Sequence, residues 1–186
     1  MSNSQLTEVN SPALALRSLQ RAVDNYVKYE DLKYACSSVL TDPLFKIYPG
    51  GVTRHHNYDG GLPVHTNEVL QFALALAVPA NADFQILTVA VILHDYLKIR
   101  DYEKDGLYWR KTQYHDQIRH VAGGYANWLL LCRQRGIGFE FQDTIGHCLL
   151  SHHGQLEWGS PIVPQTKEAQ ILHYADMMSM MYGEGR

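Results

Sequence analysis

The stretch Val91-Ile-Leu-His-Asp-Tyr-Leu-Lys98 places a histidine and an aspartate side by side at the end of an apolar run. The run belongs to an expected helix that Asn81 or Asp83 caps and that ends near Lys98. Burying His94 and Asp95 in such a helix is costly unless each finds a polar partner or a metal ion. The pair therefore indicates a functional site within the core of the fold.

Helical patterns extend from this stretch in both directions. Further helices are expected at residues 12–29, 30–40, 63–78, 113–134, 140–153 and 167–182, with irregular segments at 41–62 and 100–112. Alternating strand patterns are not recognised. We predict one all-α domain, a helical bundle over residues 13–186, preceded by a mobile arm over residues 1–12.

Composition narrows the class of protein and its expected partners. The 186 residues carry a formal net charge of −3, so strong binding to double-stranded nucleic acid is not expected. No apolar run approaches the roughly 20 residues of a membrane span, and the N-terminus does not resemble a signal peptide. Cys36, Cys132 and Cys148 are widely spaced and lie in apolar surroundings, which is typical of reduced core thiols in a cytoplasmic protein.

Histidines and aspartates recur at comparable depth in successive expected helices. The candidate metal ligands are His65, His94, Asp95, His120, His152, His153 and Asp176. A lone histidine in a helix is usually an ordinary core or surface residue, but helices that each offer one or two ligands are how a bundle builds a dinuclear centre. Imidazole and carboxylate ligands together suit divalent manganese, iron, nickel or zinc.

The order His, His-Asp, His, His-His, Asp resembles that of the HD-domain metal-dependent phosphohydrolases, over residues 40–182. Three segments are similar to the HD domain of bacterial 3′–5′ exoribonucleases: His55-His-Asn-Tyr-Asp-Gly-Gly-Leu-Pro-Val-His65-Thr, Leu93-His-Asp-Tyr-Leu-Lys98 and His147-Cys-Leu-Leu-Ser-His-His-Gly-Gln-Leu-Glu-Trp-Gly-Ser-Pro161. The chain departs from that pattern at Tyr96-Leu97, where those enzymes usually have Ile-Gly. It is also expected to lack their N-terminal oligonucleotide-binding domain.

The resemblance implies a centre of two divalent metal ions. His65, His94, Asp95 and Asp176 would hold one ion, and Asp95 would bridge to a second ion held by His120, His152 and His153. Asp95 and Lys98 are the expected catalytic residues, and His147 is expected to orient a ligand from outside the centre. Lys98 either contacts a substrate phosphate or is an ordinary charge at a helix end.

Loops near the ligands supply the candidates for substrate binding. Their aromatic rings could stack on a base and their cations could bind phosphates; they are Arg54, His55, His56, Tyr58, Tyr108, Trp109, Arg110, Lys111 and Trp158. The expected substrate is a nucleotide or a short oligonucleotide.

The function expected from the resemblance is hydrolysis of phosphate esters or anhydrides by a metal-activated hydroxide. Alternatives within the same chemistry are a 3′–5′ exoribonuclease, a deoxynucleoside triphosphate hydrolase and a dinucleoside polyphosphate hydrolase. Alternatives of a different class are a metal- or nucleotide-sensing module without catalysis and a diiron oxygenase. The oligomeric state is left open by the sequence.

Overall fold

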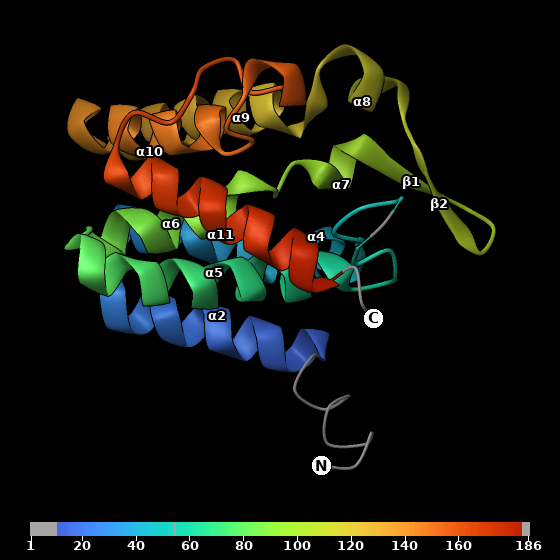
Figure 1. Ribbon diagram of the computed structural model, residues 1–186, viewed down its shortest axis with the longest axis horizontal. Helices are drawn as coiled ribbons and strands as arrows, with labels where there is room; N and C mark the ends of the chain where they lie inside the picture. The colour runs from blue at the N-terminus through green and yellow to red at the C-terminus, as the bar shows by residue number, and fades with distance from the viewer. Residues whose placement is uncertain (1–10, 54, 184–186) are drawn as a thin grey trace.

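The computed structural model describes residues 11–53 and 55–183, and most of this part of the chain is helical (Figure 1). The elements are α2 (Pro12–Tyr26), α3 (Glu30–Thr41), α4 (Pro43–Ile47), α5 (Gly61–Ala80), α6 (Phe84–His94), α7 (Lys98–Asp101), β1 (Tyr102–Asp105), β2 (Tyr108–Lys111), α8 (Gln113–Gln117), α9 (Arg119–Arg135), α10 (Phe139–Ser151), η1 (Leu156–Trp158) and α11 (Lys167–Gly183). The predicted all-α class is confirmed, with one small sheet added to it.

The arm predicted over residues 1–12 is described only at its end, where Ser11 caps α2 and Pro12 begins it. Residues 1–10 lie outside the described part of the chain. Among the helices that are described, none combines the length and the apolar character that a membrane span requires.

Helix α6 forms the centre of the fold. Every residue from Gln85 to His94 is buried, as expected for a helix that is apolar on all faces. Of the two predicted caps, Asp83 is the one that forms: its carboxylate accepts hydrogen bonds from the backbone N–H groups of Gln85 (2.8 Å) and Ile86 (3.1 Å). Packing on all sides and the N-cap at Asp83 fix the position of this helix, and with it the positions of His94 and Asp95 at its C-terminal end.

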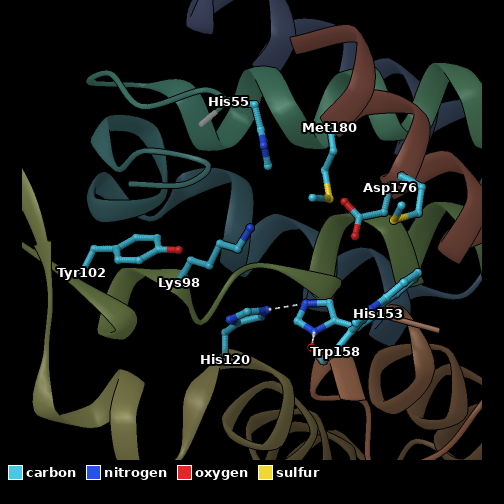
Figure 2. Close-up of a pocket in the computed structure, with 9 residues that line it drawn as sticks. His55, Lys98, Tyr102, His120, His153, Trp158, Asp176 and Met180 are labelled. Atoms are coloured by element: carbon cyan, nitrogen blue, oxygen red, sulfur yellow. Dashed lines mark hydrogen bonds between the residues drawn. The ribbon is translucent and has the colours of Figure 1, made fainter. Parts of the chain in front are cut away.

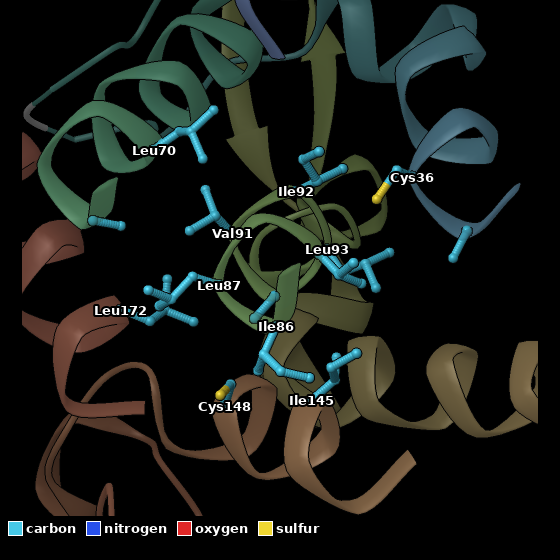
Figure 3. Packing of buried hydrophobic residues seen from close by; sticks show 14 of the residues in the cluster. Cys36, Leu70, Ile86, Leu87, Val91, Ile92, Leu93, Ile145, Cys148 and Leu172 are labelled. Atoms are coloured by element: carbon cyan, nitrogen blue, oxygen red, sulfur yellow. The ribbon is translucent and has the colours of Figure 1, made fainter. Parts of the chain in front are cut away.

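The other long helices surround α6. Helix α11 lies along α5, and α9 and α10 form a layer on the other side of α6 (Figure 1). Side chains from the surrounding helices meet α6 in the core, among them Leu70 of α5, Cys36 of α3, Cys148 of α10 and Leu172 of α11 (Figure 3). Cys36, Cys132 and Cys148 are all buried free thiols, in agreement with the sequence prediction.

A β-hairpin replaces the loop predicted at residues 100–112. Strands β1 and β2 pair in antiparallel register, with Tyr102 opposite Lys111 and Asp105 opposite Tyr108. Gly106 begins the two-residue turn with φ 61°, a conformation that costs glycine little. A glycine at the first position of a two-residue turn is a hairpin pattern, and the sequence analysis overlooked it.

Three helix boundaries also differ from the prediction. The segment at 41–62 contains the short helix α4, which Asp42 caps by accepting from Leu44 N at 2.8 Å. Helix α6 ends at His94, and a turn separates it from α7, which begins at Lys98. The helix predicted at 113–134 is divided between α8 and α9 because Arg119 adopts a left-handed φ of 66°.

Candidate metal centre

The seven predicted ligands converge although they come from different helices. His65 lies in the second turn of α5, His94 and Asp95 end α6, and Asp176 lies in α11. His120 lies in the first turn of α9, and His152 and His153 follow the last residue of α10. All of them except His153 are buried in the described structure.

Asp95 lies at the centre of this group. Its Oδ2 atom is 3.1 Å from Nε2 of His65 and 3.3 Å from Nε2 of His94. Its Oδ1 atom is 3.3 Å from Nε2 of His120 and 3.7 Å from Nε2 of His152. Each carboxylate oxygen therefore faces a different pair of imidazoles.

The remaining two residues extend the group on either side. Asp176 Oδ1 lies 3.2 Å from Nε2 of His65, and Nε2 of His153 lies 3.2 Å from Nε2 of His120. Two clusters result, each with its ligand atoms within 4.8 Å of one another: one of His65, His94, Asp95 and Asp176, and one of His120, His152 and His153.

Backbone carbonyls fix the tautomer of three of these histidines. Nδ1 of His94 bonds to the carbonyl of Val91 at 2.7 Å, and Nδ1 of His152 bonds in the same way to Leu149 at 2.7 Å. Nδ1 of His153 lies 3.0 Å from the Trp158 carbonyl. A carbonyl only accepts, so each Nδ1 carries the proton, and in the neutral ring Nε2 presents a lone pair to the centre.

His65 obtains the same tautomer through a hydroxyl. Ser179 Oγ donates its proton to Glu68 Oε2 at 3.0 Å, so the hydroxyl must accept from Nδ1 of His65, also at 3.0 Å. His56 contacts the same carboxylate oxygen of Glu68 through Nε2 at 3.1 Å. A buried chain of polar groups thus runs from the His65 ligand position to the loop before α5.

His120 has a carboxylate in place of a carbonyl. Its Nδ1 lies 2.6 Å from Oδ2 of Asp101, the fully buried last residue of α7. All five imidazoles are therefore oriented by an oxygen at Nδ1, which is the usual support for histidines that bind a metal through Nε2.

The polar atoms at the centre fit a cation. Within the described residues, Nε2 of His65, His94 and His152 and Oδ1 of Asp95 are buried without a hydrogen-bond partner. Lone pairs on nitrogen and carboxylate oxygen that face one another repel, and leaving them buried and unpaired costs free energy. A divalent ion would satisfy these atoms, whose mixed nitrogen and oxygen donor set is one that such ions accept.

The pKa values of the centre point the same way. Burial opposes charge on Asp95, but Lys98, His94, His152 and His65 together outweigh it and hold the pKa of the carboxyl well below its usual value. Burial would also lower the pKa of His65, yet the carboxylates of Asp176 and Asp95, 3.2 Å and 3.1 Å from its Nε2, raise it to about 9. For His153, burial prevails and lowers the pKa to about 4. A place that stabilises a proton between two carboxylates also favours a metal cation.

Lys98 is part of the centre. Its ammonium lies 2.5 Å from Oδ2 of Asp95 and donates a hydrogen bond to the Gly50 carbonyl at 2.7 Å. The side chain is buried at the start of α7, so it is not a solvated charge at a helix end. It connects the central carboxylate to the loop that precedes α5.

A cavity of 390 Å³ opens beside the ligands. It is lined by His55, Lys98, Tyr102, His120, His153, Trp158, Asp176, Met177 and Met180. Figure 2 shows these side chains entering it from the loop before α5, from α7 and β1, from α9, from the segment after α10 and from α11. Polar groups cover the metal-facing side, and Trp158 and the two methionines provide an apolar wall.

Two of the predicted substrate-binding residues, His55 and Trp158, line this cavity, and most of the others have different surroundings. Trp109 donates from Nε1 to Asp59 at 2.8 Å and packs against Tyr48, which fastens the hairpin to the loop before α5. His56 is engaged with Glu68. Tyr58, Tyr108, Arg110 and Lys111 do not line the cavity, and Arg54 lies outside the described residues.

His147, predicted to orient a ligand, is engaged with another segment of the chain. Its Nε2 atom accepts a hydrogen bond from the backbone N–H of Gln165 at 2.9 Å, so its ring holds the segment between η1 and α11. The sequence analysis missed the residues that do support the ligands, Asp101, Glu68 and Ser179, and the cavity residues Tyr102, Met177 and Met180.

Comparison with known proteins identifies the family. The model of the HD domain matches residues 64–181. The chain is 32% identical over 160 residues to the 3′–5′ exoribonuclease YhaM of Bacillus velezensis. This alignment covers 86% of the chain and 47% of the relative. It is 33% identical to YhaM of Bacillus subtilis over 133 residues (71% and 42%) and 32% identical to YhaM of Listeria innocua over 135 residues (72% and 43%).

The chain thus spans less than half the length of these curated relatives. No solved structure is significantly similar to it. The matched region contains all seven converging residues, from His65 to Asp176, so family and geometry refer to the same site. The chain belongs to the HD-domain family.

Proposed function

We propose that the chain is a metal-dependent phosphohydrolase that cleaves phosphodiester or phosphoanhydride bonds of nucleotides or short oligonucleotides with a dinuclear centre. The observation that carries the proposal is the position of Asp95, whose two oxygens face different sets of imidazoles. Membership of the HD-domain family and the similarity to exoribonucleases support a hydrolase.

Two divalent ions would be held here, with Asp95 facing both. His65, His94 and Asp176 would hold one ion, and His120, His152 and His153 would hold the other. When bound, such ions supply Lewis acidity toward the phosphoryl oxygens and lower the pKa of a water molecule. The nitrogen and oxygen donors suit manganese, iron, nickel or zinc.

Lys98 is proposed to contact the phosphoryl group. Its ammonium lines the cavity beside the central carboxylate, and it is fixed there by Asp95 and the Gly50 carbonyl. A cation held in place in a site with little water stabilises the negative charge that develops during phosphoryl transfer.

The cavity supports a nucleotide-sized substrate. Its volume of 390 Å³ lies within the range of small-molecule sites, roughly 300–1,000 Å³. Trp158 and Met177 provide apolar surface on which a base could stack, while His55 and Tyr102 provide groups that form hydrogen bonds. The substrate itself is proposed to reach the ions between these two walls.

The test is hydrolysis of a panel of nucleotides, cyclic dinucleotides and short RNAs by manganese-loaded protein, with products resolved by chromatography. Metal-free protein and Asp95→Ala protein are the controls. Release of mononucleotides from the 3′ end of RNA would assign the activity that the relatives are named for. Cleavage of small nucleotides alone would assign a nucleotide hydrolase. No metal-dependent product from any member of the panel would overturn the proposal.

A further inference from the structure

Asp101 is an unusual residue for a purely structural position. It is fully buried, and its Oδ2 atom lies 2.6 Å from Nδ1 of His120 and 3.3 Å from Nδ1 of His115 in α8. Its other oxygen, Oδ1, is buried and has no hydrogen-bond partner within the described residues. A buried carboxylate with one unsatisfied oxygen costs free energy that a neutral side chain in the same place would not.

The backbone holds this carboxylate firmly beneath the metal centre. The Asp101 carbonyl accepts a hydrogen bond from the Thr112 N–H at 2.9 Å, and the Thr112 hydroxyl donates to the Arg100 carbonyl at 2.6 Å. These bonds join the end of α7 to the start of α8 across the base of the hairpin. The side chain of Asp101 is therefore fixed against His120.

His120 is distinguished from the other ligands of its cluster by this partner. His152 and His153 donate from Nδ1 to neutral carbonyls, whereas His120 donates to a carboxylate. A charged acceptor strengthens the hydrogen bond and increases the electron density that the opposite ring nitrogen offers to a cation. That opposite nitrogen, Nε2, lies 3.3 Å from Oδ1 of Asp95 and 3.2 Å from Nε2 of His153.

We propose that Asp101 is a positioning residue for one of the two metal ions: it fixes the tautomer of His120 and strengthens Nε2 as a donor, so that the ion held by His120, His152 and His153 depends on it. This inference rests on the proposed dinuclear centre. It assigns to Asp101 no contact with the substrate, since Asp101 does not line the cavity.

The test compares Asp101→Asn with wild-type protein by two measurements: manganese bound after equilibrium dialysis, and affinity by calorimetry. Asparagine keeps the shape of the side chain and removes its charge. We expect one of two ions to bind roughly 10- to 100-fold more weakly and the other to be unaffected. Excess manganese should restore two ions and return kcat to within a few-fold of wild type, because only ion binding has been weakened.

Asp42→Asn is the matched control. Asp42 caps α4 and accepts from the Tyr96 hydroxyl at 2.6 Å, so this variant also changes a carboxylate to an amide next to a packed helix, but outside the centre. It should bind both ions as wild-type protein does. If Asp101→Asn does not fold, as judged by circular dichroism, Asp101→Ser removes the same charge and is measured with the same expectations.

The outcomes separate this inference from the proposed function. Wild-type protein that binds a single ion would overturn the dinuclear centre and this inference with it. Two ions in wild-type protein and two equally tight ions in the Asp101 variant would overturn this inference alone. A loss of kcat that excess manganese does not restore would also overturn it, because positioning through His120 predicts rescue by metal.

Discussion

Nε2 of His120 and Nε2 of His153 lie 3.2 Å apart, and in the neutral rings neither nitrogen carries a proton. Each ring donates from Nδ1, to Asp101 in one case and to the Trp158 carbonyl in the other. Two lone pairs therefore point at each other next to Oδ1 of Asp95, which is 3.3 Å from His120. Such a contact is repulsive unless a cation lies between the groups.

This repulsion predicts that metal removal destabilises the fold. A ligand at a hundredfold excess over its dissociation constant stabilises a single site by about 2.7 kcal/mol. For a domain of this size that corresponds to a rise in unfolding temperature of roughly 5–11 °C. Thermal unfolding before and after treatment with a chelator, and again after manganese is added back, measures the difference. Equal unfolding temperatures in all three samples would contradict the prediction.

Asp95→Ala should abolish turnover while the helices remain folded. It removes the carboxylate that faces both clusters, so at least one ion should be lost. It also leaves the buried ammonium of Lys98 without its partner, and breaking such a pair costs about 3–5 kcal/mol.

The double variant Asp95→Ala/Lys98→Met separates the two effects. It should recover part of the lost stability, because the unpaired charge is gone, but none of the activity. Circular dichroism and metal analysis on the same preparations check both. Turnover by either variant in the presence of excess metal would show that Asp95 is not essential.

The convergence of these histidines and aspartates could be predicted from sequence because burying them is costly. His94 and Asp95 interrupt an apolar helix, and Asp176 lies among apolar residues in α11, so each one marks a place where polar chemistry offsets burial. The apolar pattern likewise predicted α6, with Asp83 as one of two candidate caps, although the helix ends at His94 and not near Lys98. Local pattern and local cost are sufficient for such residues.

The supporting residues could not be predicted in this way. Asp101 and Glu68 acquire their roles from partners 19 and 111 residues away in the chain, in His120 and Ser179. The loop aromatics were assigned a functional role where the structure gives them a structural one. Trp109 has a side chain suited to stacking on a base, but its contacts with Asp59 and Tyr48 fasten the hairpin to the loop before α5. Only the folded arrangement distinguishes these uses.

Lys98→Met should lower kcat on the order of 10²-fold without loss of metal. The ammonium lines the cavity and is held by Asp95 and the Gly50 carbonyl, while methionine keeps much of its length without the charge. Lys104→Met is the control, because Lys104 lies on the exposed hairpin, where it pairs with Asp59 of the loop before α5. Steady-state kinetics and metal analysis check the prediction. Full kcat in the Lys98 variant with both ions bound would remove Lys98 from the mechanism.

His55→Ala should raise KM several-fold more than it lowers kcat, with metal content unchanged. The ring lines the cavity, and although it lies close to His56 and His65, it is outside the two clusters that contain Asp95 and His120. Burial, together with the nearby His65 and Lys98, lowers the pKa of His55 to about 4, so above that pH the ring is neutral and contributes a hydrogen bond rather than a charge. The ratio of variant to wild-type KM should therefore stay constant between about pH 6 and pH 8. A ratio that grows as the pH falls through this range would show that His55 binds the substrate as a cation.

His56→Ala provides the contrast: His56 contacts Glu68 and does not line the cavity, so its loss should lower the unfolding temperature more than it changes KM.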